Sequence, residues 1–146
     1  MKAINQQAPV QCTQSILINA SAATVWQWLT GINEWSQWQQ QIPVAKAAGK
    51  VAAGTPFHWK TGGATIRSTV HTAQPFTSFG WTGNTMGLYA IHNWTLQEQV
   101  DGSTLVRVEE SMEGWLARLF KKSFNKNLAT GMAFWLAALK TVAEKR

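Results

Sequence analysis

The sequence has few of the residues that mark secreted, membrane-spanning or disordered chains. Cys12 is the only cysteine among 146 residues, so no internal disulfide can form and nothing indicates an oxidising compartment. Residues 1–11 are largely polar, and no apolar run approaches the roughly 20 residues that cross a bilayer, which argues against a secretory signal and a transmembrane helix. Charged residues make up only 14%, with 45% hydrophobic, unlike a disordered chain. We expect one cytoplasmic globular domain spanning residues 1–146.

Two features are present in excess: tryptophan, with nine residues, and basic charge near the C-terminus. Tryptophan combines a large apolar ring with a hydrogen-bond donor, so it suits both cores and ligand pockets. Residues 1–114 carry six basic and six acidic side chains, whereas residues 115–146 carry seven basic ones against Glu144 alone. The net charge of +6 therefore belongs to the C-terminal segment.

Short β-prone runs between turn residues predict an antiparallel sheet. Strands are expected near residues 11–18, 42–48, 55–61, 64–73, 77–85, 88–99 and 104–113. After the first strand, Ser21 can cap one helix and Asn33 a second short one. Residues 115–144 keep an apolar stripe at helical spacing, which predicts either one helix or a short helix running into a long one, with Gly131 as the expected bend. The pattern predicts an α+β fold: a seven-stranded curved antiparallel sheet around a long C-terminal helix, with two short helices after the first strand.

Strand alternation divides the side chains into an inner and an outer set. The predicted inner set is mainly aromatic, with a few polar members, and two side chains of the long helix face it. These candidate ligand-binding residues are Phe57, Trp59, Ser68, Phe79, Trp81, His92, Trp94, Val108, Glu110, Met132 and Trp135. Apolar walls with few polar anchors are typical of small-molecule sites. Whether the indoles line a hollow or fill it stays open at this point.

Pairing of the last two strands gives the sharpest chemical prediction. A three-residue loop, Asp101-Gly102-Ser103, pairs inner with inner residues and sets Trp94 opposite Glu110. His92 then lies diagonal to Glu110, close enough to hydrogen-bond. A carboxylate in an apolar interior must be paired or protonated. At the rim of the sheet, Glu110 would instead meet water and have no role.

The order of elements resembles the START/Bet v 1-like (SRPBCC) superfamily, in particular its polyketide cyclase/dehydrase and lipid transport group. The resemblance is carried by Ile18-Asn19-Ala20 through Val25-Trp26, Trp35-Ser36-Gln37-Trp38, Phe79-Gly80-Trp81-Thr82-Gly83, Ala90-Ile91-His92-Asn93-Trp94 and the stretch 106–114. It covers nearly the whole chain. It implies a helix-grip fold with a cavity for a hydrophobic or amphipathic ligand, and it carries over no common catalytic residue.

Two functions are compatible with these residues. The first is binding of a hydrophobic or amphipathic molecule, such as a lipid-, polyketide- or aromatic-like compound, in the cavity between sheet and helix. The second is a cyclase or dehydratase in which His92 and Glu110 act as general acid and base. No nucleophile motif, phosphate loop or cofactor signature accompanies them, so no cofactor is expected.

The basic helix face carries a weaker prediction. Arg118, Lys122 and Lys126 repeat every four residues. Together with Lys121 they could contact an anionic membrane surface or an acidic partner, although a solvated helix face is the commoner explanation. Nucleic acid is not an expected partner, because the charge is confined to one helix and the aromatics are assigned to the interior. The histidines do not cluster with other ligand types, so no metal site is expected.

Overall fold

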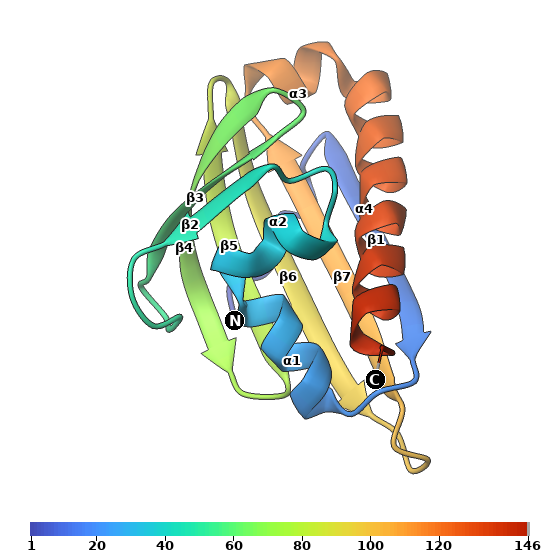
Figure 1. Cartoon of the computed structure of the whole chain (residues 1–146). Coiled ribbons are helices and arrows are strands. Elements are labelled where there is room, and N and C mark those ends of the chain that lie inside the picture. Colours follow the sequence, from blue (N-terminus) through green and yellow to red (C-terminus); the bar gives the residue numbers. More distant parts are fainter. Residues whose placement is uncertain (146) are drawn as a thin grey trace.

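The computed structural model describes residues 1–145, and its architecture is a single curved sheet whose inner face is covered by helices (Figure 1). The strands are β1 (Val10–Ile18), β2 (Val44–Ala47), β3 (Pro56–Thr61), β4 (Ala64–Gln74), β5 (Ser78–Thr85), β6 (Leu88–Glu98) and β7 (Thr104–Glu113). The helices are α1 (Ala22–Thr30), the 3₁₀ turn η1 (Ile32–Glu34), α2 (Trp35–Trp38), α3 (Trp115–Leu119) and α4 (Lys121–Ala143). This confirms the predicted α+β helix-grip fold.

All neighbouring strands pair antiparallel, in the order β1-β7-β6-β5-β4-β3-β2. Strands that follow one another along the chain are therefore neighbours from β2 to β7, as short connections require. The exception is β1, which pairs with the last strand. The two short helices between β1 and β2 carry the chain from one edge of the sheet to the other across the inner face.

Local sequence explains where the first helices begin. The Ser21 hydroxyl accepts a hydrogen bond from the Thr24 N–H at 3.2 Å, the N-cap that the sequence predicts for α1. Asn33 does not cap α2, contrary to expectation: its side-chain Oδ1 accepts a hydrogen bond from the Ala47 N–H at 2.9 Å. The side chain thus ties the helical connection to β2 instead of ending a helix.

The C-terminal segment is a short helix followed by a long one, which is one of the two predicted forms, but its interruption does not lie at the predicted bend. The break lies at Phe120, with φ −113° and ψ 38°, between α3 and α4, and α4 runs through Gly131 without interruption. The apolar stripe that the sequence predicts along this segment is buried over only part of its length. Residues of α4 up to Gly131 are at most partly buried, whereas its buried side chains lie further on, at Met132, Trp135, Leu136, Leu139, Val142 and Ala143.

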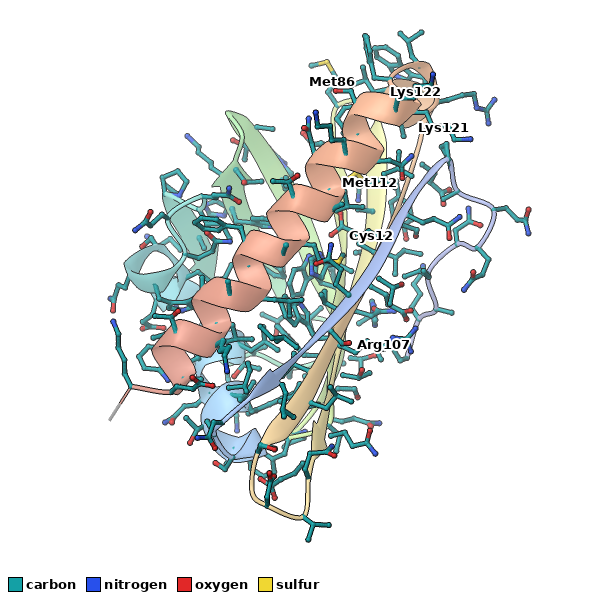
Figure 2. The ribbon with its side chains drawn as sticks, turned by 90° about the vertical axis from the view of Figure 1, so that its right-hand side faces the viewer. Cys12, Met86, Arg107, Met112, Lys121 and Lys122 are labelled. Carbon is teal, nitrogen blue, oxygen red and sulfur yellow. The ribbon has the colours of Figure 1, made fainter. Side chains whose placement is uncertain are left out.

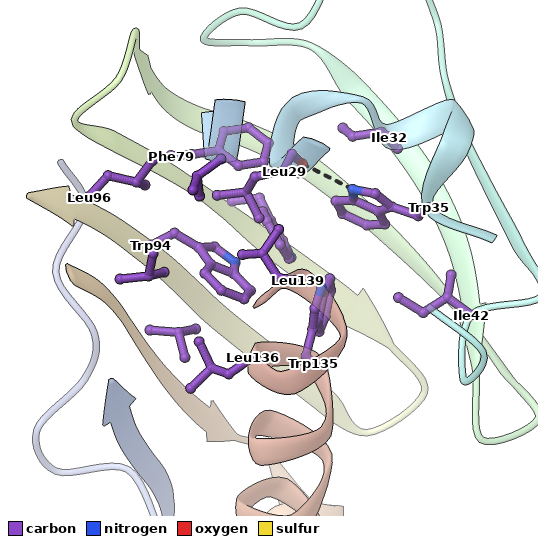
Figure 3. Close-up of a cluster of buried hydrophobic side chains, with 14 of the residues drawn as sticks. Leu29, Ile32, Trp35, Ile42, Phe79, Trp94, Leu96, Trp135, Leu136 and Leu139 are labelled. Atoms are coloured by element: carbon purple, nitrogen blue, oxygen red, sulfur yellow. Dashed lines mark hydrogen bonds between the residues drawn. The ribbon is translucent and has the colours of Figure 1, made fainter. Parts of the chain in front are cut away.

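The core lies between the inner face of the sheet and the helices α1, α2 and α4 (Figure 3). Trp35 on α2 is fully buried, and its indole N–H donates to the Leu29 carbonyl at 3.0 Å. Apolar side chains of α1 and of the second half of α4, such as Leu29 and Leu139, complete it. Burial of this kind, at about 25 cal/mol per Å² of apolar surface, is the main force that holds the helices on the sheet.

Candidate functional site

The inner face of the sheet is organised in rows that run across the strands. The register places Cys12, Glu110, His92, Trp81 and Val70 side by side, from β1 across β7, β6 and β5 to β4. We call this row the polar row, because it carries the only buried carboxylate of residues 1–145. It lies on the face that α4 covers.

Within the polar row, His92 and Glu110 are direct partners. The two residues face each other across β6 and β7, and the His92 Nδ1 contacts the Glu110 Oε1. Both residues are buried, and each provides the polar partner that the other needs in an apolar interior. The sequence predicts that these two side chains meet, but in a different register of β6 and β7.

The predicted register of β6 and β7 is wrong by two residues. Trp94 lies opposite Val108, and His92 lies directly opposite Glu110 rather than diagonal to it. The reason is the turn. Gln99 N–H donates to the Ser103 carbonyl at 2.7 Å, so the three-residue loop is 100–102 and not 101–103. The error is even, so every side chain keeps its predicted face.

Beside the polar row lies a cluster of aromatic rings centred on Trp135 of α4. Its ring centroid lies 5.3 to 5.9 Å from those of five neighbours. These neighbours are Trp35, Trp59, Trp81, His92 and Trp94. The His92 imidazole stacks on Trp81 at 4.3 Å with the planes 13° apart. We call these six residues the aromatic floor; here the indoles fill the space between sheet and helix.

Three nitrogens in the aromatic floor have no hydrogen-bond partner among residues 1–145. They are the Nε2 of His92 and the indole Nε1 atoms of Trp94 and Trp135, all buried. Trp59 shows the contrast, because its indole N–H donates to the Ser68 hydroxyl at 3.0 Å. A buried polar group left unpaired costs about 1–3 kcal/mol, so three such nitrogens, one of them on the imidazole itself, require an explanation.

Next to the aromatic floor, toward α3, the inner face is lined by small residues and is partly open to solvent. The register aligns Met112, Ala90, Gly83 and Ser68 in one row across β7, β6, β5 and β4. Met112 and Ala90 are partly exposed, and so is Cys12 in the polar row. Figure 2 shows Cys12 and Met112 beside α4. We call this region the mouth, because solvent reaches the inner face there.

The first half of α4 covers the mouth through polar contacts. Asn125 accepts a hydrogen bond from the Gln11 N–H at 3.1 Å and donates to the Pro9 carbonyl at 3.0 Å. Gln14 donates to the Ala129 carbonyl at 2.9 Å. Few apolar groups are buried along this half, so it is attached to β1 less firmly than the second half is attached to the core.

All eleven predicted ligand-binding residues are buried, and the structure brings most of them together. Trp59, Trp81, His92, Trp94 and Trp135 belong to the aromatic floor. Met132 and Val108 lie in the same core cluster as the floor, as do Phe57 and Phe79. Ser68 reaches the floor through its bond to Trp59, and Glu110 through His92. Sequence reasoning did not identify Cys12, although alternation from Ile16 and Ile18 places it on the inner face.

Two hollows lie on the surface rather than in the interior. One, of about 730 Å³, borders β2, β3 and β4 and touches Phe57 and Ser68. The other, of about 780 Å³, lies between the α1–α2 region and the last turns of α4, and includes Trp28, Trp38 and Phe134. Neither of these two hollows contains a residue of the aromatic floor.

The outer face of the sheet holds a separate polar group around His71. Asn93 donates to the Lys2 carbonyl at 2.7 Å, which fixes the N-terminal segment across β6. His71 lies at a bulge of β4, and a Cβ on Gly80 would come within 2.4 Å of its ring, so only glycine fits there. The Nδ1 of His71 lies 2.8 Å from the Thr72 hydroxyl, and burial lowers the pKa of His71.

The structure also bears on metals and membrane spans. No group of three histidine, cysteine or carboxylate side chains within residues 1–145 is arranged to hold a metal ion. No helix in the described part of the chain is long and apolar enough to cross a membrane.

The sheet, the covering helix and the buried inner site define a helix-grip protein of the START/SRPBCC type. The family described as "Polyketide cyclase / dehydrase and lipid transport" matches residues 9–144, and the chain belongs to this family. No curated protein matches the sequence.

Several solved structures share the fold at low sequence identity. The hypothetical protein jhp0584 from Helicobacter pylori is 17% identical, with a TM-score of 0.85, 99% of this chain and 98% of that chain being covered. A START superfamily protein from Mycobacterium smegmatis is 14% identical, with a TM-score of 0.80 and coverage of 92% and 97%. The Zhui aromatase/cyclase from a Streptomyces species is 12% identical, with a TM-score of 0.78 and coverage of 93% and 94%. At these identities the likeness shows the fold alone.

Proposed function

We propose that this protein binds an amphipathic small molecule, apolar over most of its surface and carrying at least one hydrogen-bond-accepting oxygen, on the inner face of the sheet beneath α4. The observation that carries the proposal is the set of unpartnered nitrogens on His92, Trp94 and Trp135. Two of them are indole N–H groups, which can only donate. A ligand carbonyl, phenol or carboxylate oxygen between them would satisfy both.

The route to this site is the mouth. Ligand entry needs the first half of α4 to move away from β1, and that half is held by hydrogen bonds from Asn125 and Gln14 rather than by buried apolar surface. The Trp135 ring must then turn aside, because it contacts the rest of the aromatic floor. Helix displacement and ring rotation of this kind are local openings that do not require the whole domain to unfold.

The experiment is a titration of intrinsic tryptophan fluorescence with fatty acids, aromatic polyketides and sterols, followed by native mass spectrometry. The matched variants are Trp94→Phe and Trp135→Phe, which keep a ring and remove the indole N–H. We expect a ligand to quench the native protein, and each variant to weaken binding about five- to tenfold, as the loss of one hydrogen bond requires. No response to any ligand class, or native affinity in both variants, would contradict the proposal.

A second function is favoured by the arrangement of His92 itself. Glu110 holds the Nδ1 side of the ring, which leaves the Nε2 free toward the interior, as in a general acid–base histidine positioned by a carboxylate. In a dehydration of a β-hydroxy carbonyl compound, His92 would remove the α-proton and return it to the departing hydroxyl, releasing water. Glu110 would act as a positioning residue.

This enzyme hypothesis is tested with β-hydroxy and poly-β-carbonyl thioesters as substrates and separation of the products by chromatography. We expect His92→Ala to abolish turnover while leaving ligand binding measurable, and Glu110→Gln to lower the rate. If a variant that combines His92→Ala with Glu110→Gln turned over substrate at the native rate, these residues would not carry out the reaction.

A further inference from the structure

One end of the molecule exposes large apolar side chains that the core does not use. They come from the β5–β6 turn, from α3 and from the junction between α3 and α4. We call these four side chains the apolar tip. They are Met86, Trp115, Leu119 and Phe120, with exposed fractions of 82%, 62%, 66% and 51%. Figure 1 shows α3 beside the β5–β6 turn at this end. Single exposed apolar residues are normal, but four from neighbouring segments are not.

The apolar tip is held together by the backbone of two glycines. The Leu116 N–H donates to the Gly87 carbonyl at 3.2 Å, which docks α3 on the turn. A Cβ on Gly87 would lie 2.9 Å from the Trp115 indole, and one on Gly114 would lie 2.4 Å from the Gly87 oxygen. The close approach fixes Trp115 next to Met86. Backbone contacts between the β5–β6 turn and α3 therefore fix the position of this exposed surface.

Basic side chains surround the apolar tip without acidic ones among them. Arg118, Lys121, Lys122 and Lys126 are all exposed, and no Asp or Glu occurs between Gly114 and Ala143. None of the four forms an ion pair with any residue of the described chain, 1–145. Figure 2 shows Lys121 and Lys122 at the same end as Met86. The positive charge and the apolar surface therefore face the same environment.

We infer that this end of the protein docks on membranes that contain anionic phospholipids. The basic side chains fit lipid phosphates, and a tryptophan with neighbouring leucine and phenylalanine side chains fits the boundary between head groups and acyl chains. A hydrated acidic protein surface would match the charge but would leave the apolar tip without a partner. The sequence alone indicated the basic residues Arg118, Lys121, Lys122 and Lys126; the structure adds the apolar tip that lies beside them.

The test is co-flotation of the full chain with vesicles of phosphatidylcholine alone or with 30% phosphatidylserine, at low and high salt. We expect binding only to the anionic vesicles, with loss at high salt. The Lys121→Ala/Lys122→Ala variant should bind about 25-fold more weakly, since each basic residue near the surface is worth about fivefold. The Leu119→Ser/Phe120→Ser variant should weaken binding by at least tenfold.

Two controls keep the test specific. Lys46→Ala/Lys60→Ala removes the same charge from the exposed β2–β3 region, and Val100→Ser removes an exposed apolar side chain at the β6–β7 turn. Both should bind vesicles like the native protein, and thermal melts should confirm that every variant is folded. Binding that ignores lipid charge, tip variants that bind like the controls, or a native dimer that Phe120→Ser dissociates would overturn the inference. These results do not depend on a ligand in the interior.

Discussion

Replacement of Trp135 by alanine tests whether the aromatic floor is as tightly packed as the distances indicate. Trp135 is 6% exposed and contacts five aromatic rings. Removal of a buried Trp or Phe side chain costs about 3–5 kcal/mol through lost burial and the cavity that remains. No hydrogen bond is lost, because its Nε1 has no partner among residues 1–145, and alanine favours the helix slightly. We therefore expect a loss of about 3–4 kcal/mol.

The assay is urea unfolding followed by circular dichroism, with Phe134→Ala as the matched control. Phe134 is the neighbouring residue on α4 and is 38% exposed, so its truncation should cost less than about 1 kcal/mol. Indole at millimolar concentration should raise the midpoint of Trp135→Ala and leave the native protein unchanged, because only the variant has a cavity for it. A Trp135→Ala variant that loses no more stability than Phe134→Ala would refute the packing argument.

Three further predictions concern the buried pair, a surface histidine and a turn. Glu110→Ala should destabilise the protein by about 3–5 kcal/mol, because it leaves His92 buried without its partner. In a double-mutant cycle, His92→Ala should cost less in the Glu110→Ala background than in the native protein, although it removes the stacking on Trp81 in both; additive losses would argue against the pair. The pKa of His71 is lowered from 6.5, so stability should decline as pH falls below about 6.5, and His71→Gln should flatten that part of the pH profile of urea midpoints; an identical profile would exclude His71 as its source. Gly114→Ala should cost at least about 2 kcal/mol by calorimetry, because φ is +114° and a Cβ would meet the Gly87 oxygen; a native-like melting temperature would contradict this.

Strand alternation was sufficient to assign the inner face. Side chains such as Trp59, Trp81 and Trp94 carry a period-two pattern that survives small errors in register, and all of them are buried as predicted. The exact cross-strand partners did not follow from the alternation, because they depend on the length and position of the turn between β6 and β7. The loop begins one residue earlier than expected, so Gly102, with φ +87°, is its last residue, and this single difference moved His92 from a diagonal position to one directly opposite Glu110.

The position of the interruption in the C-terminal segment could not be predicted from periodicity. The apolar spacing continues through Phe120, so a break there has no local signal, whereas Gly131 is a weak helix former that the sequence singles out. In the structure, nothing lies within 4 Å of a Cβ at Gly131, so the residue is simply tolerated inside α4. The break at Phe120 instead accompanies the docking of α3 on Gly87, a contact between segments far apart in the chain.

The pairing of β1 with β7 has a consequence for how the chain reaches its native state. The sheet joins Val10 to Met112, so its first strand stays without a backbone partner until a segment about a hundred residues away has been synthesised and ordered. Forming such a contact early means closing a very long loop, which is slow and entropically unfavourable. On the ribosome, the hairpins from β2 to β6 can assemble first, and the N-terminal strand joins only when nearly the whole domain has emerged.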